Sequence, residues 1–191
     1  MPTYVAFLRA INLGKNRKVP MADLRACLTD AGCEEVETHI QTGNVRLRTS
    51  LRSAAKVEAQ LEGLLADRFG FEIPSIVFTP AQLAQVYDDA MSAAPPQGNA
   101  RGDLRYVALF KQGEAPAGDA ARAIAAWAEP GEAGLVIGRA VHIWIDKASQ
   151  SARFFTAFKK PLDPGTNRNL TVVSALAAKW GGVTVRGWGT P

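Results

Sequence analysis

The order of the apolar segments along the chain limits its fold more than any other feature. Short apolar runs predict strands, and apolar residues that recur every three or four positions predict helices. Over the first 92 residues the predicted order is strand, helix, strand, strand, helix, strand and a last helix. These elements are a strand at 4–11, a helix at 21–31, strands at 36–40 and 45–48, a helix that ends at Phe69, a strand at 73–79 and a helix from Pro80 to about Met91.

Proline and glycine residues mark the ends of the predicted helices. Pro20 precedes the first helix and Pro80 opens the third, because proline fits the first turn of a helix, where its missing N–H is not needed. Gly32 and Gly70 follow the first two helices. Glycine readily adopts the left-handed conformation that ends a helix, so both positions support the predicted boundaries.

The same order begins again after residues 95–102, which are dense in proline, glycine and asparagine. We therefore predict a first half at 1–92, a linker at 93–103 and a second half at 104–191. In the second half the pattern predicts strands at 105–110, 135–137 and 141–145, a helix through Ile124, a short helix at 152–159, a helical face that includes Val173 and Trp180, and a closing strand at 183–186.

Strand, helix, strand, strand, helix, strand is the order of a ferredoxin-like fold. The sequence thus predicts an α+β protein made of two ferredoxin-like (βαββαβ-type) halves related by internal duplication. The duplication rests mainly on the order of elements, because the shared sequence is only Tyr-Val-Ala, at 4–6 and again at 106–108.

This topology brings two polar loops together. The first two strands of such a half are parallel, and the third strand lies between them in the opposite direction. The loop at 12–18 follows the first strand, and the turn at 41–44 follows the second. We therefore expect both loops at the same edge of the first sheet.

The charge of the chain mildly favours anionic partners. There are 22 Lys and Arg residues against 18 Asp and Glu, a net charge of +4. No segment approaches the roughly 18 apolar residues of a membrane span, and the first apolar run is too short for a signal peptide. We therefore expect a cytoplasmic protein without membrane contact.

The chain has two cysteines, too few for a four-thiolate zinc site. We expect no metal and no cofactor.

Cations in the loop at 12–18 suit an anion site. Lys15, Arg17 and Lys18 come just before a helix whose first backbone amides point outward, as phosphate sites require. The alternative is an ordinary solvated loop. In the turn at 41–44, Gly43 is explained by the turn itself, whereas the side chains of Gln41 and Thr42 are free for a ligand.

A second group of cations lies before the last helix. The lysine pair at 159–160 and Arg168 have no structural explanation in the sequence, and Asn169 is the expected helix cap. Single-stranded nucleic acid would require aromatic side chains between such cations, although aromatic residues at this spacing are also typical of a core. The aromatic residues in question are Phe154, Phe155 and Phe158.

Known catalytic arrangements are absent from the sequence. It has no Ser, His and Asp order, no metal-binding helix and no dinucleotide loop. His39 and His142 lie within strand patterns, without a carboxylate or cysteine at ligand spacing, so we expect both to be structural.

Four motifs also resemble a known family. They are YVAFLRAINLG at 4–14, KVPM at 18–21, IQTGNV at 40–45 and TNRNLTV at 166–172. In combination they resemble the bacterial DUF1697 family, a domain of unknown function, over nearly the whole chain. The chain departs from the family pattern at Ala10, where glycine is common, and at Leu170, where tryptophan is common. The resemblance implies a ferredoxin-like α+β topology and transfers no catalytic residue.

The family motifs coincide with the loops that the topology places together. The leading hypothesis is a protein that binds a phosphate-bearing ligand, nucleic acid or nucleotide, through these basic loops. One alternative is an enzyme that acts on a small anionic substrate, with Lys15 or Lys18 positioning its charge. The other is a structural module that forms a homodimer through sheet edges. The predicted ligand-binding residues are Arg9, Asn12, Gly14, Lys15, Lys18, Gln41, Gly43, Asn44, Lys160, Arg168 and Asn169.

Overall fold

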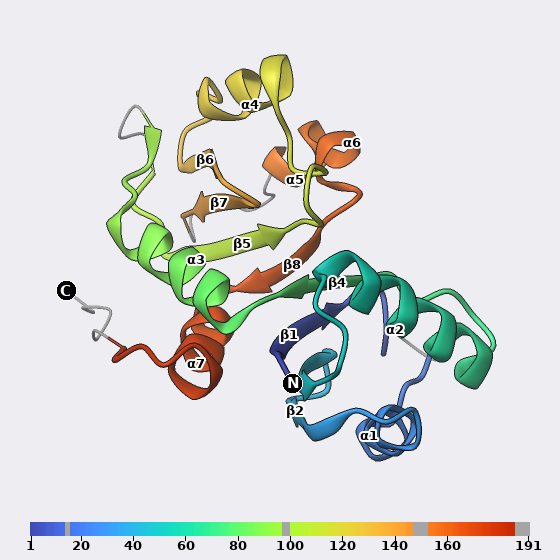
Figure 1. Ribbon diagram of the computed structural model, residues 1–191. Coiled ribbons are helices and arrows are strands. Elements are labelled where there is room, and N and C mark those ends of the chain that lie inside the picture. Colours follow the sequence, from blue (N-terminus) through green and yellow to red (C-terminus); the bar gives the residue numbers. More distant parts are fainter. Residues whose placement is uncertain (14–15, 97–99, 147–152, 186–191) are drawn as a thin grey trace.

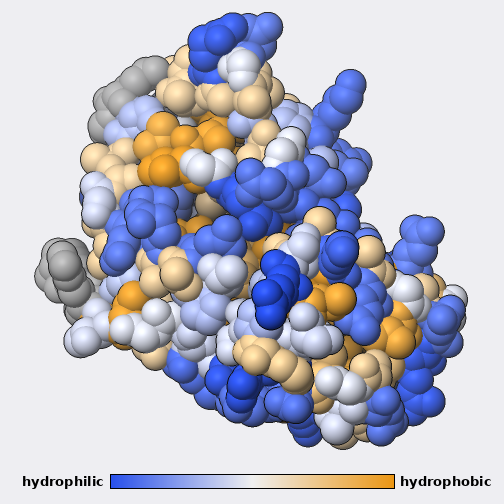
Figure 2. Space-filling view, in the orientation of Figure 1, coloured by the Kyte–Doolittle hydropathy of each residue, from blue (hydrophilic) through white to orange (hydrophobic). Residues whose placement is uncertain are grey.

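The structure, a computed structural model, describes residues 1–13, 16–96, 100–146 and 153–185. Within these residues it contains two four-stranded antiparallel sheets with helices packed around them (Figure 1). On the face shown in Figure 2, hydrophilic residues cover most of the surface, and apolar residues form smaller patches among them.

The first half has the predicted topology. Its elements are β1 (Thr3–Leu8), α1 (Met21–Asp30), β2 (Glu34–His39), β3 (Asn44–Arg48), α2 (Ala54–Phe69), β4 (Ser75–Phe78) and α3 (Pro80–Ser92). The strand β1 pairs antiparallel with β3 and β4, and β3 also pairs antiparallel with β2. It follows that β1 and β2 are parallel and end at the same edge of the sheet, as the sequence predicted.

The second half repeats this topology. Its elements are β5 (Leu104–Leu109), α4 (Gly118–Ala125), β6 (Glu132–Ile137), β7 (Ala140–Ile145), α5 (Arg153–Ala157), α6 (Lys159–Leu162), β8 (Thr166–Asn169) and α7 (Leu170–Trp180). The strand orders are β2-β3-β1-β4 and β6-β7-β5-β8, so each strand has its counterpart at the same place in the other sheet. The fold class is α+β with two ferredoxin-like halves, while internal duplication stays a prediction.

The last strand of the second half is not where the sequence predicted it. The closing strand expected at 183–186 is wrong, because residues 183–185 form no strand and Arg186 lies outside the described residues. The fourth strand of the second half is β8, which pairs with β5. Thr166 and Arg168 of β8 are buried and Asn167 is exposed, so the strand alternates as a half-buried strand should. Its inward side chains are polar, which is why hydrophobic patterning missed it.

Each sheet is packed on both of its faces. One face of the first sheet buries a core with α1 and α2 that includes Leu24 and Leu61, and one face of the second buries a core with α4 and α5 that includes Ile124 and Phe154. The remaining faces share a third core with α3 and α7, which pack against each other (Figure 1). An antiparallel sheet often leaves one face to solvent. Here the helix after each fourth strand closes that face, so the halves meet around a common core.

His142 is a buried, neutral group of the second half. The ring is fully buried on β7, and neither nitrogen has a hydrogen-bond partner within the described residues. Burial lowers the pKa of His142 to about 4, with a smaller contribution from the charge of Arg105, while Asp89 acts in the opposite direction. The histidine is therefore uncharged in the folded protein at neutral pH.

Acid is expected to destabilise the protein through His142. An unfolded histidine has a pKa of about 6.5, so between about pH 6.5 and 4 the unfolded state binds a proton that the folded state does not. The contribution of His142 to the free energy of unfolding is therefore fully present above this range. It falls by about 2 kcal/mol between about pH 7 and pH 4.5. Urea unfolding at both pH values measures the loss in the wild type and in His142→Leu. The variant should lose about 2 kcal/mol less over this interval, and an equal loss in both proteins would contradict the assignment.

Candidate functional site

The loops that follow β1 and β2 meet, as their topology requires. The Asn12 side-chain amide donates to the backbone oxygens of Gln41 (2.7 Å) and Val19 (3.2 Å), and its oxygen accepts the Val19 N–H (2.8 Å). These bonds close the loop after β1 onto the turn after β2. The polar side-chain atoms of Asn12, which the sequence analysis assigned to a ligand, therefore form hydrogen bonds that fix the conformation of the loop.

The turn between β2 and β3 is equally well fixed. Gly43 has a φ of 73°, and its backbone oxygen accepts the N–H of Leu8 (2.8 Å). Asn44 is fully buried, and its amide donates to the His39 backbone oxygen (3.1 Å) and the Thr42 hydroxyl (2.9 Å). The remaining side-chain oxygen of Asn44 faces the second half of the molecule.

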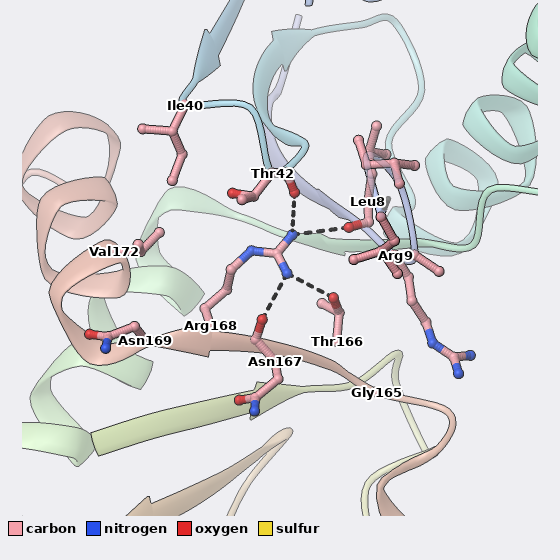
Figure 3. A pocket seen from close by; sticks show the side chains of 13 residues that line it. Leu8, Arg9, Ile40, Thr42, Gly165, Thr166, Asn167, Arg168, Asn169 and Val172 are labelled. Carbon is pink, nitrogen blue, oxygen red and sulfur yellow. Dashed lines mark hydrogen bonds between the residues drawn. The ribbon is translucent and has the colours of Figure 1, made fainter. Parts of the chain in front are cut away.

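Arg168 crosses from β8 to this turn. Its side chain is buried, with 8% of the residue exposed, and each of its five N–H groups donates to an acceptor within the protein. The acceptors are Asn44 Oδ1 (2.7 Å), Thr166 Oγ1 (2.8 Å) and the backbone oxygens of Leu8 (3.0 Å), Thr42 (2.9 Å) and Asn167 (2.9 Å), four of them drawn in Figure 3. One guanidinium thus joins both sheets.

All five acceptors are uncharged, so the positive charge of Arg168 has no counter-ion among the residues that the structure describes. None of the ion pairs between described residues includes it. Burial lowers the pKa of Arg168 to about 10, which still leaves the group protonated at neutral pH. The ring of Phe7 lies 5.7 Å from the guanidinium carbon and stabilises the cation only in part. The junction between the halves therefore carries an unneutralised buried charge.

A cavity of about 530 Å³ lies beside this arginine. Residues from both halves form its wall: Leu8, Arg9, Ala10, Ile11, Leu13, Ile40, Thr42, Gly165, Thr166, Asn167, Arg168, Asn169 and Val172. Figure 3 shows Ile40, Val172 and Asn169 on one side of the Arg168 guanidinium and Gly165 on the other. We call this space the junction cavity. Its size lies within the range of small-molecule sites, about 300–1,000 Å³.

The first half's contribution to the cavity wall has an unusual backbone. The wall residues Ala10 and Ile40 have φ values of 54° and 51°, and Asn12, next to the wall, has a φ of 55°. A β-branched residue rarely adopts this left-handed conformation, and the Ile40 side chain is not stabilised by deep burial, because the residue is 48% exposed. Backbone strain of this kind costs about 1–3 kcal/mol per residue and clusters at functional sites. Leu13, at 65% exposed, is a second large apolar residue of the wall that is open to solvent.

The predicted site residues fall into three groups. Arg9, Arg168 and Asn169 line the junction cavity; Arg9 pairs with Asp163 (3.0 Å), extending away from Arg168 (Figure 3), and Asn169 caps α7 through the Thr171 N–H (2.8 Å). The second group surrounds the cavity or supports its wall without lining it, and consists of Asn12, Gln41, Gly43 and Asn44. The third is not brought together there: Lys18 and Lys160 are exposed outside the wall, and Gly14 and Lys15 lie outside the described residues.

The sequence analysis missed the apolar part of the wall. Leu13, Ile40 and Val172 line the cavity but were treated as ordinary neighbours of polar loop residues. The available signal was that two of them, Leu13 and Ile40, are large apolar residues inside loops dense in Gly, Asn, Lys and Thr, where no core contact is expected. Asn167 was also missed, because its strand had not been predicted.

The phenylalanines near Lys160 do not form an aromatic binding surface. Phe154 and Phe158 are buried in the core of the second half, and Phe155 packs edge-on against Tyr106 at 5.7 Å between ring centroids. These contacts leave Phe154 and Phe158 unavailable to stack on a base. The aromatic residues therefore belong to the packing of the second half, which is one of the two interpretations that the sequence allowed.

The fold and the junction define the class of protein: an α+β protein of two ferredoxin-like halves with a shared core and a cavity where their sheets meet. A family model described as "Protein of unknown function (DUF1697)" matches residues 1–142, and the chain belongs to this family. The match confirms the resemblance drawn from the motifs, three of which lie within the matched residues. It ends before the fourth, at 166–172, which includes Arg168.

A solved structure shares the fold. It is described as "The structure of conserved bacterial protein SP0830 from Streptococcus pneumoniae", and it is similar to this chain with a TM-score of 0.70 and 24% sequence identity, covering 94% of this chain and 98% of that one. At this identity the similarity shows the fold alone. A comparison with curated proteins gave no match. Among the helices of the described residues, none has the length and apolarity to span a membrane.

Proposed function

We propose that the junction cavity binds a phosphate-bearing ligand of nucleotide size. The observation that carries the proposal is the buried charge of Arg168 in the cavity wall, which no carboxylate of the described residues neutralises. A buried charge without a counter-ion is unfavourable, and an anion bound beside it would stabilise the cation. Because the five N–H groups of Arg168 are engaged, it acts on the ligand through its field and not through a hydrogen bond.

The rest of the wall fits the other parts of a nucleotide. The apolar side chains of Leu13, Ile40 and Val172 offer surface for a base ring, and the exposed amide of Asn167 offers a donor and an acceptor. Arg9 forms an ion pair with the exposed Asp163. It is a cation of the cavity wall, and such a surface pair contributes little to stability. Apolar walls with a few polar groups are typical of small-ligand sites.

Binding is better supported than catalysis. The described residues of the cavity wall include no His, Cys, Lys, Asp or Glu side chain, so they supply no general base, and the two threonine hydroxyls have no such partner there. Pairing through β4 is also disfavoured, since the Val77 N–H is taken by Glu58 (2.9 Å) and the Val77 oxygen by Arg139 (3.1 Å). A homodimer through other edges stays a prediction.

Charge at the rim of the cavity should control affinity. We compare Ile40→Asp with Ile40→Asn, because both residues tolerate the left-handed backbone and differ mainly in charge. Adenosine 5′-monophosphate, titrated by calorimetry, should bind the aspartate variant roughly five- to tenfold more weakly than the asparagine variant. Wild-type protein should also prefer adenosine 5′-monophosphate to adenosine. Equal affinities of the two variants, or of the two ligands, would contradict an anion site in the cavity.

A further inference from the structure

Two further hollows continue the junction cavity along the first half. The first, of about 310 Å³, shares Arg9 and Ala10 with the junction cavity and adds Arg17, Glu72 and Pro74. The second, of about 420 Å³, shares Glu72 and Pro74 with the first and reaches Lys111 of the second half. Because neighbouring hollows share wall residues, the three lie next to one another in a row, which we call the rim groove. The two added hollows offer space beyond the junction cavity, which by itself has the size of a small-molecule site.

Arg17 forms a flat surface in the middle of the rim groove. Its Nε donates to the Ala10 oxygen (2.7 Å) and its Nη2 to the Glu72 oxygen (2.6 Å). The guanidinium carbon lies 4.7 Å from the centre of the Phe71 ring. These contacts fix the plane of the guanidinium and cover one of its faces, while Arg17 itself lines the hollow. Unstacked bases of nucleic acids bind on such guanidinium planes.

The charges along the rim groove favour a polyanion. Arg168 and Arg17 have no carboxylate partner among the described ion pairs, whereas Arg9 and Lys111 are paired with Asp163 and Glu62. The Glu62 carboxylate that holds Lys111 (2.7 Å) also accepts the Ser75 N–H (2.8 Å), so the protein shares this carboxylate between two donors. Glu72 is the one acid of the three hollows' described walls without an ion pair.

We propose that the ligand of the rim groove is a single-stranded oligonucleotide. The inference rests on the proposed function: one nucleotide occupies the junction cavity beside Arg168, the next base stacks on Arg17, and a following phosphate lies near Lys111. A site for a single nucleotide would bind longer chains no more tightly, whereas this proposal predicts that affinity increases with the length of the oligonucleotide. Arg17 and Lys111 are the residues that produce the increase.

The experiment measures affinity against ligand length. Adenosine 5′-monophosphate and oligoadenylates of two, four and six nucleotides are titrated into the full chain by fluorescence anisotropy competition. A stacked base should strengthen binding roughly tenfold. Lys111→Gln and Arg17→Lys should each remove most of this gain; the lysine keeps the charge of Arg17 and loses its plane. Lys111→Gln, which is outside the junction cavity, should leave the affinity for adenosine 5′-monophosphate unchanged. Glu72→Gln should strengthen hexanucleotide binding by about threefold. Lys56→Gln, an exposed position on α2, is the matched control.

The outcomes separate this inference from the proposed function. If adenosine 5′-monophosphate binds and length adds nothing, or if Lys56→Gln loses as much as Lys111→Gln, the oligonucleotide proposal is overturned and the mononucleotide site stands. If neither the mononucleotide nor the oligonucleotides bind, both proposals are overturned. If a hexaglutamate peptide binds as tightly as the hexanucleotide, with the same dependence on Arg17 and Lys111, the rim groove is a site for acidic peptides and the nucleic-acid assignment is wrong.

Discussion

Arg168→Ala is expected to lower the free energy of unfolding by about 3–5 kcal/mol. The substitution removes five hydrogen bonds and leaves the buried oxygens of Asn44 and Leu8 without the donor that now serves them. An unsatisfied buried acceptor costs about 1–3 kcal/mol, and the truncated side chain also leaves a void between the two sheets. Chemical denaturation of the wild type and the variant measures the difference.

The control for Arg168 is an arginine with an exposed partner. Arg122→Ala removes an ion pair with Asp119 on the surface of α4, where such pairs contribute little, about 0–1 kcal/mol. Arg168→Lys keeps the charge and loses the planar fork of donors, so it should lie between the two alanine variants. If Arg168→Ala and Arg122→Ala cost the same, the guanidinium does not hold the halves together and the account of the junction is wrong.

Gly43→Ala is the second change with a large expected effect, a loss of about 3 kcal/mol. A Cβ at this position would lie 2.6 Å from Ile11 Cδ1 and 2.7 Å from Leu8 Cβ, which requires displacement of the cavity wall, typically at about 1–3 kcal/mol. The φ of 73° adds a left-handed backbone penalty of about 1–2 kcal/mol for any residue with a Cβ.

Gly70→Ala separates the two causes. Gly70 ends α2 with a φ of 77°, and a Cβ there meets nothing within 4 Å, so only the backbone penalty of about 1–2 kcal/mol applies. Thermal or urea unfolding of both variants gives the comparison. A loss in Gly43→Ala no larger than that in Gly70→Ala would show that the turn does not pack tightly on β1 and the cavity wall.

The topology of the first half was predictable because it depends on local signals. Apolar periodicity defined the helices, Gly32 and Gly70 marked their ends, and the parallel relation of β1 and β2 followed from the order of elements. The meeting of the loops at Asn12 and Gln41 is a consequence of that order. The strand β8 was not predictable in this way, because its buried residues, Thr166 and Arg168, are polar and satisfy each other and the first half instead of an apolar core.

Three of the predicted site residues, Arg9, Arg168 and Asn169, line the junction cavity, but the contacts that they make there were not predictable. Arg168 stood out as a cation without a local explanation, yet its partners Leu8, Thr42 and Asn44 lie more than 120 residues away in the sequence. No local pattern contains such contacts. The same limit hid the wall formed by Ile40 and Val172, since an apolar residue in a loop reveals its role only when the other half of the molecule is placed beside it.

The measurement that tests the central claim most directly follows the Arg168 Nε–H signal by NMR during a titration with adenosine 5′-monophosphate. If the junction cavity binds the phosphate-bearing ligand beside this charge, the Arg168 signal and the backbone amides of Thr42 and Asn167 should shift together and reach saturation. Adenosine should shift them far less, and added salt should weaken the effect. Saturable shifts confined to surface residues such as Lys18 and Lys160, with the Arg168 signal unchanged, would contradict the account.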